Sequence, residues 1–438
     1  MKKPLNFILS FLFPLCVLSQ NKMLTIEEAI ATSLQNNYEI QLSKNDSLVA
    51  ALNYSYRNAA FLPRLNGNAG ATWNTNNSKQ ILFDGTRKEK AALKSNTVSA
   101  SLGLNWTLFD GLKMFATRDK AEQLLQLGEL GIKNQVINTV ATVVRTYYNI
   151  VRQKQQLKAI EEEMSINEEK VKLAQYKLDI GAGTKPDVLQ SKVDLNAQKA
   201  AQMEQQTLIA QLREQLNQVM NVAPGALYDV SDTIPLNKNL SLGEIQNGIE
   251  TSNPLLLINK KNIDIANLTL KERKADQFPI ISFNSAYTFT RTRNQSVINS
   301  FSTLFNRNKG INYGITATIP ILNNFNTKRL IQQARLDIKY EQLVYDNQKS
   351  QINLNILNAF QDYQQQQKAL ALEEENILLA KENVTIVFET YRLGAATLIQ
   401  LKEAQKSLED AYNRLIAARY NTKLAETELL SLKGDLVK

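Results

Sequence analysis

The chain has 438 residues, no His and a single Cys, and its 51 basic against 42 acidic residues give a net charge of +9. The lack of His and the lone Cys16 exclude the commonest metal sites and acid–base catalysts, so we expect no cofactor, no metal ion and no enzymatic activity. Lys and Arg are interspersed with Glu rather than gathered in a basic run, which favours solvated helix faces over a nucleic-acid partner.

The first residues are typical of an export signal. Lys2 and Lys3 form a charged end, and residues 7–18 form an apolar core too short to span a bilayer, so we expect residues 1–20 to be a cleaved signal peptide. A retained N-terminal anchor helix is the alternative. The residues before Cys16 lack the small side chains of a lipoprotein signal, and no lipid anchor is expected there.

Alternating side chains predict β-hairpins in two places. Thr25 is the expected N-cap of a helix over residues 25–60, and a second helix over residues 242–277 occupies the matching place in the second half. Each helix precedes two strands with a period of two. The hairpins span 65–108 and 281–319, with polar loops expected at 77–96 and 293–310.

Apolar residues at seven-residue intervals predict a very long coiled-coil helix over residues 112–179. The same stripe returns later in the chain. Ile356 follows Val143 by 213 residues, and the other members of the second stripe follow their counterparts by the same offset. A return helix is expected over residues 186–220. The chain is therefore expected to be a tandem duplication. Its parts are a first repeat at 21–221 with a helical hairpin at 112–220, a connector at 222–241, and a second repeat at 242–438 with a helical hairpin at 325–434.

The four strands have about the length that a membrane-spanning strand needs, and one face of each is apolar while the other is rich in amides and hydroxyls. Candidates for the aromatic girdles of a membrane protein are Trp73, Trp106, Tyr287 and Tyr313. A soluble sheet packed on a protein core is the alternative, since alternation alone does not distinguish lipid from a protein interior. Four strands cannot close a barrel, so the membrane interpretation requires an oligomer, and a trimer would supply twelve strands.

Several short motifs accompany these elements. The mature chain opens with Leu-Thr-Ile-Glu-Glu-Ala-Ile at residues 24–30, and the first hairpin ends in Trp106, Phe109, Asp110 and Gly111. The two helix turns share a pattern at the offset of 213, with Gly181 and Thr184 in the first and Gly394 and Thr397 in the second. Glycine suits a left-handed helix end, and threonine caps the next helix. With these motifs, nearly the whole mature chain resembles the TolC-like outer-membrane efflux proteins.

The resemblance implies a mainly α-helical protein with a transmembrane β part. In this family a homotrimer forms a twelve-stranded β-barrel in the outer membrane, continuous with a periplasmic α-helical barrel, and it carries no catalytic or cofactor site. The implied partners are a periplasmic adaptor (membrane fusion) protein, an inner-membrane pump and outer-membrane lipid. The implied function is the exit duct of a tripartite efflux or type I secretion system.

The resemblance also implies a periplasmic aperture at the helix turns, for which Asp187, Tyr391, Gln400 and Glu403 are the candidate residues. The sequence differs from the family at Ala396, where a basic residue is often found, so an ionic latch is not predicted. It differs also at Asn324, which replaces a glycine at the exit of the second hairpin. A periplasmic coiled-coil scaffold or tether with a soluble sheet is the alternative function.

Overall fold

The computed structural model describes residues 23–237 and 239–437, so the signal peptide expected at residues 1–20 lies outside the described residues. The chain divides into two units. The helical unit includes the described chain up to Leu42, residues 133–253 and the chain from Gln351 onward, and the sheet unit comprises residues 43–132 and 254–350. Across the described ranges, no helix has a stretch long and apolar enough to cross a membrane.

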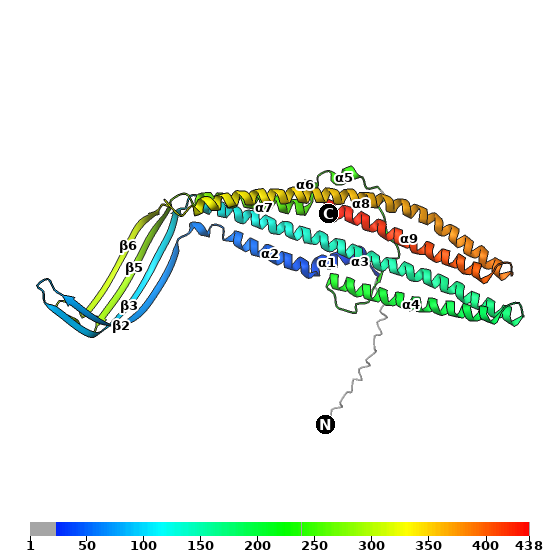
Figure 1. The fold of residues 1–438 in the computed structure, drawn as a ribbon, viewed down its shortest axis with the longest axis horizontal. Helices are drawn as coiled ribbons and strands as arrows, with labels where there is room; N and C mark the ends of the chain where they lie inside the picture. Colours follow the sequence, from blue (N-terminus) through cyan, green and yellow to red (C-terminus); the bar gives the residue numbers. More distant parts are fainter. Residues whose placement is uncertain (1–22, 238, 438) are drawn as a thin grey trace, which may run out of the picture. The chain divides into compact units, whose positions relative to one another are not determined.

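The sheet unit contains one four-stranded antiparallel sheet in the order β2-β3-β5-β6 (Figure 1). The strands are β2 (Arg64–Ile81), β3 (Arg87–Phe109), β5 (Ile280–Asn294) and β6 (Phe305–Thr318). The polar loops expected at 77–96 and 293–310 are wrong at their edges, because both hairpins continue pairing into them. Only residues 82–86 and 295–304 separate the paired strands. Polar side chains broke the alternation there, but backbone pairing does not require an apolar face.

The register gathers the apolar positions of the four strands on one face of the sheet. Rows that cross the sheet on this face include Leu102–Tyr287–Ile311 and Trp106–Phe283–Ile315. The opposite face carries Asn, Thr, Ser and Gly. On it, the Asn105 side-chain amide donates to Asn284 (2.5 Å), whose own amide donates to Thr316 (3.1 Å). The apolar face remains exposed, since Ile311 is 70% and Tyr313 77% accessible.

Two helical hairpins dominate the rest of the chain, and in each the second helix runs back along the first (Figure 1). The first consists of α3 (Lys113–Asp179) and α4 (Lys185–Met220), and the second of α8 (Asn326–Arg392) and α9 (Leu398–Lys433). The first and last residues of α8 and α9 each follow those of α3 and α4 by 213 positions, for example 326 − 113 and 433 − 220. The heptad stripes are buried at matching depths, because Val143 and Ile356 are both 0% exposed.

The helix expected at 25–60 is interrupted, which corrects the single-helix prediction. It consists of α1 (Ile26–Asn36), α2 (Tyr38–Ser55) and the 3₁₀ turn η1 (Ala59–Phe61). The break lies at Asn37, whose side-chain oxygen accepts a hydrogen bond from the Glu39 N–H (2.9 Å) and whose amide donates to the Val219 carbonyl (2.8 Å). This asparagine therefore starts α2 and ties it to α4.

The helix expected at 242–277 is likewise three helices, α5 (Leu242–Gln246), α6 (Ile249–Ser252) and α7 (Pro254–Ala275). Gly248, with φ +80°, separates the first two, and the extended Asn253 precedes Pro254. The ring of a proline disfavours helical backbone at the residue before it, so the helix is interrupted at Asn253. The Asn253 side-chain amide donates to the Leu432 carbonyl (2.7 Å).

The connector expected to be irregular contains a short strand. β4 (Asp229–Val230) pairs in parallel with β1 (Met23–Leu24). Buried Tyr147 joins both, because its hydroxyl donates to the Leu24 carbonyl (2.8 Å) and accepts from the Ser231 N–H (3.1 Å). The main core of the helical unit surrounds this point, where α1, α3 and α4 meet.

Candidate functional site

The turn between α3 and α4 is closed by backbone hydrogen bonds and a threonine cap. Gly181 has φ +77°, and its N–H donates to the Leu178 carbonyl (3.0 Å), an arrangement that ends a helix in a left-handed residue. The Thr184 hydroxyl accepts a hydrogen bond from the Asp187 N–H (3.4 Å) and donates one to the Asp187 carboxylate (2.6 Å). Asp187 is thereby held in the first turn of α4, where an acid favours the helix dipole.

The turn between α8 and α9 has the same plan with a fuller cap. Gly394 has φ +81° and donates its N–H to the Tyr391 carbonyl (3.1 Å). The Thr397 hydroxyl accepts from the Gln400 N–H (3.3 Å), and the Gln400 side-chain oxygen accepts from the Thr397 N–H (2.8 Å). This reciprocal capping box occupies the Gln400 side chain within its own turn.

A lysine that sequence reasoning did not single out joins the two turns. Lys177, in the last turn of α3, places its Nζ 4.1 Å from the ring centroid of Tyr391 and donates to the Tyr391 carbonyl (2.5 Å). Tyr391 is buried, and burial together with the nearby Asp187 charge raises the pKa of its hydroxyl. Lys177 is thus the cation that links α3 to the end of α8, and the Asp187 charge is near enough to affect the Tyr391 hydroxyl.

The other two aperture candidates lie apart from this contact. Gln400 and Glu403 border a groove between α8 and α9, which Asn383, Val387 and Ala396 also line. Glu403 is exposed there. The structure therefore separates Tyr391, which is buried against Lys177, from Gln400 and Glu403, which are exposed. Asp187 is half-buried in the first turn of α4.

Away from the turns, a buried polar layer joins α3, α4 and α9. Lys170 of α3 is 1% exposed, and its Nζ lies 2.9 Å from the Asp194 carboxylate of α4. Lys402 of α9 reaches the other oxygen of Asp194 at 3.0 Å. About one helical turn further from the α3–α4 and α8–α9 turns, the Gln405 amide donates to the Asn167 oxygen (3.3 Å). The charges of the layer are therefore paired across three helices.

The pKa shifts in the layer follow from burial and these partners. Burial lowers the pKa of Lys170, while the Asp194 carboxylate opposes that loss of charge. Burial alone would raise the pKa of Asp194, but hydrogen bonds from Lys170, Gln190 and Lys402 outweigh it and lower that pKa. The layer therefore holds a carboxylate that stays ionised between two ammonium groups.

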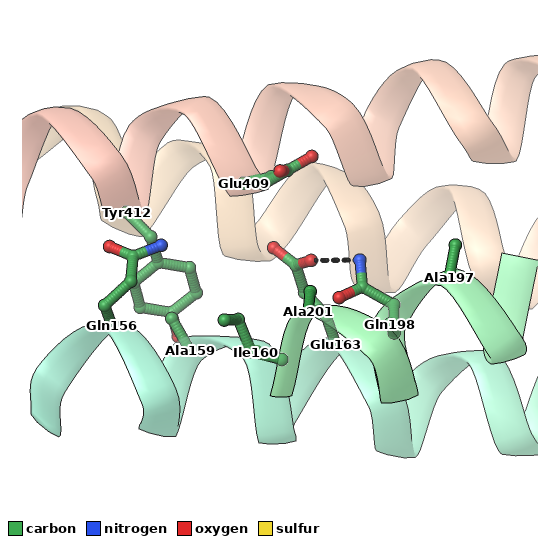
Figure 2. Close-up of a pocket in the computed structure, with 9 residues that line it drawn as sticks. All are labelled: Gln156, Ala159, Ile160, Glu163, Ala197, Gln198, Ala201, Glu409 and Tyr412. Atoms are coloured by element: carbon green, nitrogen blue, oxygen red, sulfur yellow. Dashed lines mark hydrogen bonds between the residues drawn. The ribbon is translucent and has the colours of Figure 1, made fainter. Parts of the chain in front are cut away.

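Glu163 marks the end of the layer furthest from the turns, in a pocket lined by α3, α4 and α9 (Figure 2). Its carboxylate accepts a hydrogen bond from the Gln198 amide (2.9 Å), and Glu409 of α9 also lines the pocket. Burial and the negative charge of Glu409 raise the pKa of Glu163 to about 7. This carboxyl group therefore changes charge near neutral pH.

The second hairpin packs differently. Between α8 and α9 the core is apolar, and the positions that correspond to Asn167 and Gln198 at the offset of 213 are Ala380 and Ala411. One side of α9 therefore buries apolar area against α8. In the half nearest the turns its other side meets α3 and α4 through the charges and amides of the layer, whereas further along α9 Tyr420 joins the apolar core of α3 and α4. Burial of apolar area is the stronger of the two contacts, because paired charges also lose hydration.

The strand exits adopt left-handed backbone in both copies. Gly111 has φ +72°, and a Cβ at this residue would lie 2.4 Å from the Ala275 carbonyl oxygen. Asp110 accepts from the Met114 N–H (3.0 Å) and starts α3. In the second copy Asn324 has φ +52°, a conformation that asparagine tolerates better than most residues. Phe109 follows a bulge in β3 and lies opposite Ile281.

The girdle candidates lie at different levels of the sheet. Trp106 is near the end that leads into α3, and its Nε1 donates to the Phe61 carbonyl (2.8 Å). Trp73 of β2 lies opposite Asn96 of β3, and Asn96 is ten residues from Trp106 along β3 (106 − 96). Tyr313 and Tyr287 lie between these levels. Phe305, which the sequence reasoning missed, occupies the same row as Trp73 through Asn96 and Arg293.

Comparison with known proteins identifies the chain's relatives. The sequence profile of the outer membrane efflux protein family matches residues 29–222 and 248–435, one match in each repeat. The chain belongs to this family. It is 20% identical over 412 residues to the outer membrane efflux protein BepC of Brucella suis, covering 94% of this chain and 86% of BepC.

Two further comparisons agree with this assignment. The chain is 21% identical over 433 residues to the alkaline protease secretion protein AprF of Pseudomonas aeruginosa, covering 94% of this chain and 87% of AprF. It superposes on the CmeC outer membrane channel of Campylobacter jejuni with a TM-score of 0.77 at 16% identity, over 94% of this chain and 85% of CmeC. As a member of this efflux family, the protein resides in the outer membrane, extends into the periplasm and serves as an exit duct.

Proposed function

We propose that three copies of this chain assemble into one continuous channel through the outer membrane. The observation that carries the proposal is the four-stranded sheet, which has one exposed apolar face, one amide-rich face and two open edges, β2 and β6. Neighbouring strands alternate in direction, so β2 and β6 run oppositely and β6 of one copy can continue the antiparallel pattern on β2 of the next. Three copies would close a barrel of twelve strands with no exposed edge.

The dimensions of the apolar face support a membrane location. Ten residues separate the rows of Trp106 and Trp73, which corresponds to about 33 Å along a strand. At the usual barrel tilt of about 35–45° this is about 25 Å along the membrane normal, the height of the apolar band in outer-membrane barrels. Trp106 and Trp73, with Phe305 at the same level as Trp73, would then lie at the two lipid–water interfaces.

We place the periplasmic aperture at the helix turns. The Lys177–Tyr391 contact would hold the two hairpins of one chain together, and the polar layer of Lys170, Asp194 and Lys402 would be the surface along which they separate. Polar contacts can exchange protein partners for water at small cost, whereas the apolar α8–α9 core cannot. An adaptor protein and an inner-membrane pump would bind at this end and deliver the exported molecule.

The test is the behaviour of the full chain in cells and after purification. We expect it to fractionate with outer membranes, to migrate as a trimer in mild detergent and to conduct ions in planar bilayers. Release of the protein by osmotic shock, or a monomer that does not conduct, would support the soluble scaffold instead and overturn the proposal.

A further inference from the structure

The four cations of strands β5 and β6 lie on the apolar face of the sheet, towards the end that is furthest from α3. They are Arg291 and Arg293 on β5 and Arg307 and Lys309 on β6. The register fixes their face, because Arg291 lies opposite Val98 and Arg307, and Lys309 lies opposite Phe289. At the same levels the other face carries uncharged side chains, namely those of Thr290, Thr292, Asn306 and Asn308.

Within the described part of the chain, these cations have no acidic partner. All four are exposed, and among the described residues no carboxylate lies within ion-pair distance of any of them. Arg291 and Arg307 are directly opposite each other, an arrangement of like charges that destabilises a strand pair. Lys309 and Arg307 instead lie over the rings of Phe289 and Phe305, at 5.9 and 5.5 Å from the ring centroids. An anion outside the chain would remove the repulsion.

Their depth indicates which anion this is. Eight residues separate Trp106 from Val98 on β3, the row that contains Arg291 and Arg307. This corresponds to about 26 Å along the strand and about 20 Å along the normal of a tilted barrel, against an apolar band of about 25 Å. Arg293 lies one row further from Trp106 than the Arg291–Arg307 pair, and Lys309 lies one row nearer to Trp106. Long cationic side chains at such depths extend their charges to the polar headgroups.

We propose that Arg291, Arg293, Arg307 and Lys309 form a binding site for the phosphate groups of an anionic glycolipid in the outer leaflet of the membrane. The proposal rests on the proposed function, since it requires the apolar face to contact lipid. Cα atoms of directly opposite residues are about 4.5–5.5 Å apart, so the guanidinium groups of Arg291 and Arg307 can both bind one phosphate. Arg293 and Lys309 lie beside it and serve a second phosphate of the same lipid.

The test is native mass spectrometry of the purified full-length assembly with lipid A as the probe. Wild type is expected to retain bisphosphorylated lipid A. Its affinity for the dephosphorylated lipid is expected to be lower by about tenfold or more. The R291Q/R307Q variant is expected to lose the preference, and R291K/R307K to keep part of it, because lysine keeps the charge without the paired donors. R87Q/K88Q is the matched control, since it removes two cations of β3 that lie on opposite faces, and should bind like wild type.

Conductance separates the possible failures. R291Q/R307Q should form trimers with an unchanged reversal potential, whereas a shifted reversal potential would place the cations in the channel and overturn the inference. Equal binding of both lipids by a conducting wild-type channel would overturn the inference alone. If inorganic phosphate displaced lipid A when both were at the same concentration, the site would be one for the free ion, and the inference would likewise be overturned. A wild-type protein that neither inserts nor conducts would overturn the proposed function.

Discussion

Glu163 is a carboxyl group whose burial makes folding sensitive to pH. Its pKa is raised from 4.5 to about 7, so the folded protein binds a proton that the unfolded chain has already released in this range. Stability contributed by this group is therefore present below pH about 4.5 and declines as pH rises towards about 7. Near pH 7 the negative form faces Glu409 in the same pocket.

Replacing Glu163 by Gln should remove this penalty. Glutamine keeps an oxygen for the Gln198 amide and carries no charge, so E163Q should be more stable than wild type at pH 8 by about 1–3 kcal/mol and similar at pH 4.5. Thermal unfolding of the purified assembly at both pH values measures this. E168Q, at an exposed site of α3, is the control, and an E163Q stability gain that is the same at both pH values would refute the pKa assignment.

Lys177 should restrain the aperture. Its ammonium group contacts both the ring and the carbonyl of Tyr391, so K177M removes a cation–π contact and a charged hydrogen bond. Together these are worth about 2–4 kcal/mol, so the open population should increase about tenfold or more. Single-channel recording of K177M against K172M, an exposed lysine of the same helix, measures the difference. Equal resting conductance in the two variants would remove Lys177 from the gate.

The residues of the turns were accessible from the sequence, but their partners were not. Gly181, Thr184, Gly394 and Thr397 act within four residues of themselves, so local spacing is sufficient to predict their roles. Lys177 contacts a residue 214 positions away, and Lys402 a residue 208 positions away. Such contacts depend on how the hairpins pack. The residues next to a lysine in the sequence do not indicate whether its side chain is buried or which residue it contacts.

At the scale of elements, the long helices were predictable because a heptad stripe extends along each of them. The strand ends and helix breaks were not. Pairing beyond residue 76 depends on backbone groups, which leave no pattern in the side chains. The breaks at Asn37 and Asn253 depend on amides that bond to α4 and α9, so tertiary contacts decide them.

The β3–α3 junction should tolerate no side chain at Gly111. Alanine there would combine a positive φ of +72° with a Cβ 2.4 Å from the Ala275 carbonyl oxygen, so G111A should lose about 2 kcal/mol or more. G131A, within α3 and with open space around the new methyl group, should instead gain about 1 kcal/mol from helix propensity. Thermal unfolding and trimer yield compare the two. Wild-type yield and melting temperature for G111A would contradict the assigned junction geometry.

At the scale of the assembly, each acidic residue of the groove would occur three times. Glu403 is exposed at the border of this groove, and three copies around a threefold axis would form an acidic ring that favours cations. E403Q should therefore shift the reversal potential measured in a salt gradient towards lower cation selectivity. E389Q removes an acid that pairs with Arg392 and is the control. An unshifted potential for E403Q would place Glu403 outside the pore.

The two open edges of the sheet also have a genetic consequence. Each copy presents one edge on β2 and one on β6, so the proposed ring of three copies would need both edges from every member. A copy with a damaged β6 edge would still join through β2 and leave the ring incomplete. If half of the copies in a cell were damaged, only about one ring in eight would be intact. A mutant allele of this kind would therefore be dominant over the wild-type allele.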